Sequence, residues 1–173
     1  MHEKGVKIMG LTKAFDEAIG YLLLYIIFFE GILIILASVY STFIPNLSIL
    51  DIVTASIISV HILLVPSDVV KLAGLISMLI ISIINVLINE KIKDATYAII
   101  AFYIIIALSV VLPFFINKVF IQKMSLSEAF KITLKDFIRY YITSWLFSIA
   151  YFILINIIIF YIVKSMRGKR GEQ

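Results

Sequence analysis

The sequence predicts an all-α integral membrane protein with four to five transmembrane helices and two amphipathic helices at the membrane surface. Hydrophobic residues make up 62% of the 173 residues, charged residues only 15%, and the mean hydropathy is +1.12. A soluble domain is nearer to half apolar and a quarter charged. The apolar residues gather in runs of about 20, the length that an α-helix needs to cross a bilayer. We therefore expect one multi-pass domain in the cell membrane.

The N-terminal part predicts a surface helix followed by the first span. Residues 1–17 are polar and basic with apolar residues every three or four positions, a pattern typical of a helix lying on the membrane. The first span is expected at 18–41, before Pro45. Ser48 and Asp51 then have the spacing of a capping box and open a second apolar run at 48–65. Because this run carries several polar residues, it either crosses the membrane or forms a re-entrant or interfacial helix.

The remaining spans are expected at 69–88, 95–116 and 138–163. A charged turn at 89–94 separates the first two. Pro113 should kink the 95–116 span, because proline removes the backbone hydrogen bond to the carbonyl of Ser109.

Between the last two spans, 124–137 predicts the second surface helix. Ser125 and Glu128 form a capping box at its start. Lys131, Lys135 and Arg139 recur every four residues beside an apolar face, and like charges at this spacing repel each other. Anionic lipid headgroups would remove that repulsion. These three residues, together with Lys123, are therefore the candidate headgroup-binding residues.

The segments 11–30 and 126–145 resemble each other. With a shift of 115 residues, identical pairs occur at Leu11/Leu126, Ala14/Ala129, Phe15/Phe130, Tyr25/Tyr140 and Ile27/Ile142. Such matches arise easily in apolar sequence, so both duplication and coincidence remain open. Either origin predicts the same unit, a surface helix joined to a transmembrane helix.

The stretch "LPFFINKVFIQKMSLSEAFKITLKDFIRYYITSW", at 112–145, resembles a recurring segment of a broad group of polytopic proteins. This group includes the membrane domain ahead of some glycerophosphodiester phosphodiesterases. The resemblance implies a cytoplasmic amphipathic helix between two spans. It implies no enzymatic activity, since the phosphodiesterase catalytic domain is absent from this sequence.

Glu30 and His61 are the candidate ligand or ion residues. Glu30 lies about 12 residues, or 18 Å, into its span, where an ionised carboxylate is costly. If 48–65 crosses, His61 reaches a similar depth, and the two side chains could form a proton or cation relay. Alternatively, Glu30 bonds to Asn85 or Asn156, or meets a partner subunit.

Other site chemistry is not expected. The chain has no cysteine, and one intramembrane histidine with one glutamate is too few ligands for a metal or haem. We expect no catalytic residue and no cofactor. The acidic residues near helix starts and turns are expected to act as caps. These are Asp51, Asp68, Glu90, Asp94 and Asp136. An interfacial aromatic belt accounts for the rings near span ends. These are Tyr21, Tyr97, Tyr140, Tyr141, Tyr161 and Trp145.

The distribution of lysine and arginine does not decide the orientation. Five spans place nine of these residues inside, including the 124–137 helix, while four spans also place nine inside but leave that helix outside. The resemblance favours five spans. The basic residues lack a nucleic-acid-binding pattern, so anionic lipids and other membrane subunits or further copies are the expected partners. The expected function is that of a non-catalytic accessory or scaffolding subunit, and the alternative is an oligomeric transporter or channel component that uses Glu30 and His61.

Overall fold

The computed structural model describes the backbone of residues 2–39, 49–61, 64–65 and 67–170, and the side chains of 12–39, 51, 53–61, 64–65 and 67–166. The described residues form helices and short connections, which confirms the all-α class. The longer helices are α1 (His2–Val39), α3 (Asp68–Ile88), α4 (Ile92–Ile116) and α6 (Ile142–Arg170). The shorter ones are α2 (Ile49–Ser59), the π-helical turn η2 (Asn117–Ile121) and α5 (Leu126–Tyr140).

Four helical segments within the described residues are long and apolar enough to cross a membrane. They comprise Thr12–Val39, Asp68–Ile88, Ile92–Ile121 and Ile142–Met166. The candidate span at 48–65 is not among them. Its helix α2 has 11 residues, about 16 Å, whereas a crossing needs about 20 residues. The re-entrant or interfacial alternative therefore fits α2, while a fifth crossing by 48–65, part of which lies outside the described residues, stays a prediction.

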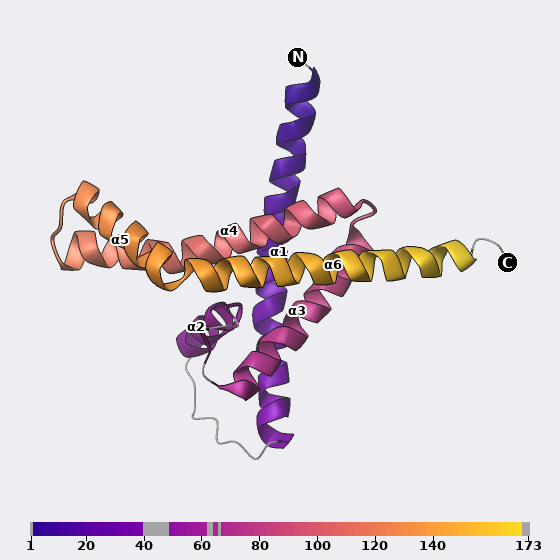
Figure 1. Cartoon of the computed structure of the whole chain (residues 1–173), viewed down its shortest axis with the longest axis horizontal. Coiled ribbons are helices and arrows are strands. Elements are labelled where there is room, and N and C mark those ends of the chain that lie inside the picture. Colours follow the sequence, from indigo (N-terminus) through magenta and orange to yellow (C-terminus); the bar gives the residue numbers. More distant parts are fainter. Residues whose placement is uncertain (1, 40–48, 62–63, 66, 171–173) are drawn as a thin grey trace.

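A stripe of buried residues joins α1 to the other helices. Its members recur every three or four positions and face α3 and α4: Ala14, Ala18, Tyr21, Tyr25, Phe29, Leu33 and Ala37. The rings of Tyr25, Phe102, Tyr103 and Phe152 form the centre of the core through a series of edge-to-face contacts. Figure 1 shows α4 and α6 side by side, with α1 running across both and α3 slanting from the lower part of α1 up to the start of α4. The four apolar helices therefore differ in direction, so they cannot all stand at the same tilt in a membrane.

The surface helix expected at 1–17 is not a separate element. The backbone is helical without interruption from His2 to Val39, so the expected boundary before residue 18 is absent. The related segment 126–145 does contain a break, at Tyr141 between α5 and α6. The two similar segments therefore have different structures.

Contacts at the ends of the helices are consistent with four crossings. Asn89, after α3, donates a hydrogen bond to Glu17 of α1 at 3.0 Å. Lys164 of α6 lines a small hollow together with Asn89 and Glu90, so this part of α6 lies at the same place. At the opposite end, the His61 ring lies against the Tyr141 ring. The start of the α1 crossing segment at Glu17, the α3–α4 turn and the C-terminal part of α6 at Lys164 thus lie together at one end, while His61, after α2, lies with the α5–α6 corner at the other.

Candidate functional site

The candidate site lies where α4 ends and α5 folds back against it. After Pro113 the helix continues to Ile116 and then widens into the π-helical turn η2. Such turns are rare and occur frequently at functional sites. Lys123 has a φ of 54°, a left-handed conformation that reverses the chain between η2 and α5. The Ser125 hydroxyl then accepts a hydrogen bond from the Glu128 backbone N–H at 3.3 Å, so the predicted N-cap is present.

An ion pair fixes α5 against the end of α4. The Lys118 Nζ atom lies 2.6 Å from Asp136 Oδ2. The Lys118 side chain is only 12% exposed, whereas the Asp136 side chain is 46% exposed. The lysine is thus enclosed with its counter-ion, while the carboxylate also reaches the surface. Asp136 was expected to cap a helix at its start or in a turn. It is the eleventh residue of α5, so this prediction is wrong.

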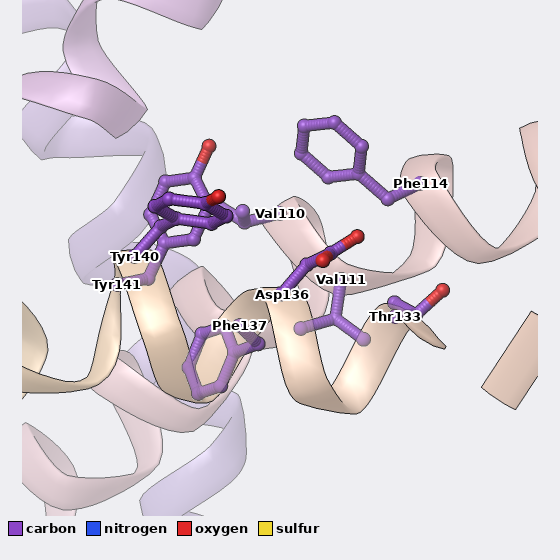
Figure 2. Close-up of a pocket in the computed structure, with 8 residues that line it drawn as sticks. All are labelled: Val110, Val111, Phe114, Thr133, Asp136, Phe137, Tyr140 and Tyr141. Carbon is purple, nitrogen blue, oxygen red and sulfur yellow. The ribbon is translucent and has the colours of Figure 1, made fainter. Parts of the chain in front are cut away.

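Beside this ion pair lies a cavity of about 370 Å³ between α4 and α5. Figure 2 shows the Asp136 carboxylate reaching into the space between the Phe114 ring and the rings of Tyr140 and Tyr141. The full lining comprises Val110, Val111, Phe114, Thr133, Asp136, Phe137, Tyr140 and Tyr141. The volume is within the range of about 300–1,000 Å³ that is usual for small-molecule sites. The arrangement is an aromatic-lined hollow with one carboxylate.

Helix α5 presents three different faces. Ala129 and Thr133 are buried against the protein. A second face exposes large apolar side chains: Leu126, Phe130, Leu134 and Ile138. The third face carries Lys131, Lys135 and Arg139, all exposed, and Lys123 is exposed just before the helix. The predicted apolar face is therefore divided between the protein and the surroundings, and the four predicted headgroup-binding residues lie beside its outer part.

His61 is buried, with 1% of its surface exposed, and lies outside the four crossing segments. Neither ring nitrogen has a hydrogen-bond partner, and the ring packs edge-on against Tyr141, 6.3 Å between centroids. Burial lowers the pKa of the imidazole to about 4, because a charged ring would lose its hydration there. His61 is therefore a neutral packing residue behind the wall of the cavity.

Glu30 does not meet His61. Its side chain is exposed on the outer face of α1, beside the exposed residues Ile27, Gly31 and Ile34. The expected relay has no geometric basis here, since neither His61 nitrogen is bonded to any group.

The expected bond from Glu30 to Asn85 or Asn156 is also wrong, because these two amides bond to each other. Asn85 Nδ2 donates to Asn156 Oδ1 at 2.8 Å, and Asn156 Nδ2 donates to Ser82 Oγ at 3.0 Å. The acidic residue that joins this network is Glu17, through Asn89.

Tyr21 also belongs to this end of the core rather than to an aromatic belt. It is buried beside Asn89, in contrast to Tyr97, Tyr140 and Tyr161, which are exposed. Among the described residues, no three histidine or acidic side chains are placed to hold a metal ion.

Lys118 was not among the predicted site residues. It lies at the end of a span, where a lysine is ordinarily read as an anchor. The sequence feature that points to this ion pair is Asp136. It is an acidic residue on a basic helix, and it lies on the same side of that helix as Ala129 and Thr133, the side expected to pack against the rest of the protein.

Comparison with known proteins finds no matching family model, no similar curated protein and no similar solved structure. The resemblance of 112–145 to the membrane domain ahead of some glycerophosphodiester phosphodiesterases therefore stays a prediction.

Proposed function

We propose that the protein is a non-catalytic, multi-pass component of the cell membrane that acts as an accessory or scaffolding subunit. The observation that carries this proposal is the position of Glu30. It is exposed on an otherwise apolar face of α1, about nine residues or 13 Å from the end of the span at Val39. An acidic side chain deep in hydrocarbon costs about 2.5–3.5 kcal/mol on insertion scales. A polar or basic group of another membrane chain would remove this cost.

The chemistry of the spans favours a different chain over a second copy as the basic partner. The lysines of the crossing segments lie within about one turn of their ends: Lys13, Lys71, Lys93, Lys118 and Lys164. A second copy would therefore offer no basic group at the depth of Glu30. This supports an accessory role in a membrane complex with a different subunit.

The second part of the proposal is that α5 rests on anionic lipid. Its exposed apolar face suits the edge of the hydrocarbon region, and its basic face suits the headgroups above it. Replacing Lys131, Lys135 and Arg139 together by glutamate is expected to abolish any preference of the purified protein for anionic over neutral vesicles. An unchanged preference would contradict this part.

Extraction of the protein from native membranes in mild detergent tests the accessory role. The wild-type chain is expected to co-purify with at least one other membrane chain, and Glu30→Leu is expected to lose that chain. Because leucine removes a carboxylate from an apolar face, the Glu30→Leu protein should itself remain folded. Asp16→Asn is the matched control, since Asp16 is exposed near the start of the same span and should not matter. A wild-type protein that is extracted alone would overturn the proposal.

The transport alternative has no supporting geometry in the described residues. Glu30 lies on the outside of the helix assembly, and His61 is enclosed without a polar partner. A measured proton or ion flux that is lost in Glu30→Gln would revive that alternative.

A further inference from the structure

Two hollows meet at the Lys118–Asp136 ion pair. One is the aromatic cavity of Figure 2, and the other, also of about 370 Å³, lies on the side of η2. The second is lined by Pro113, Phe114, Asn117, Lys118 and Gln122. Phe114 lines both hollows, Asp136 lines the first and Lys118 lines the second. The two hollows are therefore neighbours on either side of Phe114, with a negative group in one and a positive group in the other, and together they are called the groove below.

The first half has the chemistry of a site for an organic cation. Tyr141 connects two other rings of its lining, since its ring centroid is 6.2 Å from that of Phe137 and 6.4 Å from that of Phe114. Aromatic faces attract ammonium groups within about 6 Å, and groups of such rings recognise choline-like ligands. The Arg139 guanidinium lies 5.3 Å from the ring centroid of Tyr140, so one cation–π contact is already present at this corner. The Asp136 carboxylate adds a negative charge, and only its Oδ2 atom is engaged by Lys118.

The second half has the chemistry of a site for a phosphate. Lys118 supplies an ammonium group, and the side chains of Asn117 and Gln122 supply amide donors. Gln122 Nε2 donates to Asn117 Oδ1 at 3.1 Å, which orients the Asn117 amide with its NH₂ group left for another acceptor. Hydrogen bonds from an ammonium group to phosphate are among the stronger ones in proteins.

We propose that this groove binds the zwitterionic head group of one membrane phospholipid, with its ammonium group among the aromatic rings beside Asp136 and its phosphate beside Lys118. The ion pair presents a positive and a negative group side by side, which complements a head group whose phosphate and ammonium are two carbon atoms apart. The groove lies at the end of a crossing segment and under a helix with an exposed apolar face, at the level where head groups lie. The acyl chains would then extend along the exposed apolar side chains Leu112 and Ile116 of α4.

This site is distinct from the basic face of α5. The exposed lysines attract any anionic surface, whereas the groove discriminates between head groups by their ammonium group. The inference does not depend on the accessory role, because it rests on the α4–α5 corner and not on Glu30.

The test is lipid binding to the purified full-length protein in detergent, followed by native mass spectrometry. The lipids are phosphatidylcholine, phosphatidylethanolamine and phosphatidylglycerol with identical acyl chains, the last of which has no ammonium group. With Lys131, Lys135 and Arg139 replaced by glutamine, so that the basic face no longer attracts anionic lipid, the protein is expected to bind the first two about tenfold more tightly than phosphatidylglycerol, given cation–π and carboxylate contacts. Equal or tighter binding of phosphatidylglycerol would overturn the proposal. Soluble phosphocholine at the same concentration should not displace the lipid, and if it does, the assignment to a membrane lipid is wrong.

Two variants locate the binding. Phe114→Leu is expected to weaken binding of the two zwitterionic lipids about threefold to tenfold and to leave phosphatidylglycerol unchanged. Phe120→Leu makes the same change at an exposed ring outside both linings, and should have no effect. Similar losses in both variants would overturn the site. Asp136→Asn keeps an oxygen that can accept from Lys118 but removes the charge, so it should reduce the preference without unfolding the corner. An unchanged preference in a folded Asp136→Asn protein would also count against it.

Discussion

The contact between α2 and α3 makes a quantitative prediction for Gly74→Ala. Gly74 is buried in α3, and a Cβ atom there would lie 3.0 Å from the Ser59 carbonyl oxygen, 3.3 Å from Ser59 Cβ and 3.3 Å from Tyr25 Oη. The first of these atoms belongs to the backbone of α2, so it moves only if the end of α2 moves. Such a shift would also stretch the hydrogen bond between Tyr25 Oη and Ser59 Oγ, which is 2.7 Å long.

The expected change in stability follows from two opposing terms. Overpacking of this kind costs about 1–3 kcal/mol. Alanine in place of glycine in a helix interior increases the free energy of unfolding by about 0.8–1 kcal/mol. The net effect of Gly74→Ala is therefore a loss of about 1 kcal/mol. Gly20→Ala is the matched control, because a Cβ atom at Gly20 in α1 would meet nothing within 4 Å and should stabilise by up to about 1 kcal/mol.

Thermal unfolding in one detergent, followed by circular dichroism, compares the two variants. A difference of about 2 kcal/mol corresponds to about 4–8 °C in Tm for a chain of this size, with Gly74→Ala below and Gly20→Ala above the wild type. Hydrogen exchange should also quicken in α2 of Gly74→Ala alone. If both variants raise Tm equally, α2 does not pack on α3 at this point and the reasoning fails.

Three further predictions concern other parts of the chain. The pKa of His61 is about 4 when folded and about 6.5 when unfolded, so its neutral form contributes stability that is complete above about pH 6.5 and is lost as pH falls towards 4, by up to about 3 kcal/mol. His61→Phe keeps the ring contact and should flatten the pH dependence of Tm in this range, and an unchanged dependence relative to wild type would contradict the burial of a neutral ring. Asn156→Leu removes hydrogen bonds between α6 and α3 and should lower stability by about 1–2 kcal/mol in thermal unfolding, whereas a more stable variant would show that the bonds contribute nothing. Lys123→Gly relieves a left-handed conformation at φ 54° and should raise stability by about 1 kcal/mol in the same assay, and a loss would mean that the turn does not adopt this conformation.

The sequence predicts the features of this fold that depend on local composition. Run length identifies the four long apolar helices, and the spacing of Ser125 and Glu128 identifies the start of α5. The length of α2 could not be found in this way, because 48–65 is as apolar as a true span. What sets it apart is tertiary: the bond from Ser59 to Tyr25, and the burial of His61 against Tyr141.

The candidate site could be predicted only in part, for a related reason. Depth along a helix can be counted from sequence, but the direction in which a side chain points depends on how the helices rotate against each other. Glu30 points away from the other helices, so of the contacts expected for it only the one with a partner subunit stays open, and it is Glu17 that joins the asparagine network. Lys118 and Asp136 are 18 residues apart, and their pairing depends on the angle at which α5 folds back.

The four-crossing arrangement leads to a prediction about sidedness that differs from the one implied by the resemblance. The end with the start of α1, the α3–α4 turn and the end of α6 carries nine of the fifteen lysines and arginines: Lys4, Lys7, Lys13, Lys91, Lys93, Lys164, Arg167, Lys169 and Arg170. The positive-inside rule then places this end in the cytoplasm and α5 on the other side.

Because the chain contains no cysteine, single cysteines can be introduced without removing others. Glu90→Cys lies in the α3–α4 turn and Ser127→Cys in the first turn of α5, and both positions are exposed. In intact cells a membrane-impermeant maleimide should label Ser127→Cys, and it should label Glu90→Cys only after permeabilisation. The reverse pattern would keep four crossings but place α5 in the cytoplasm, as the resemblance implies. Labelling of both positions from the same side would be incompatible with α4 crossing the membrane, and would remove the basis for placing the groove among head groups.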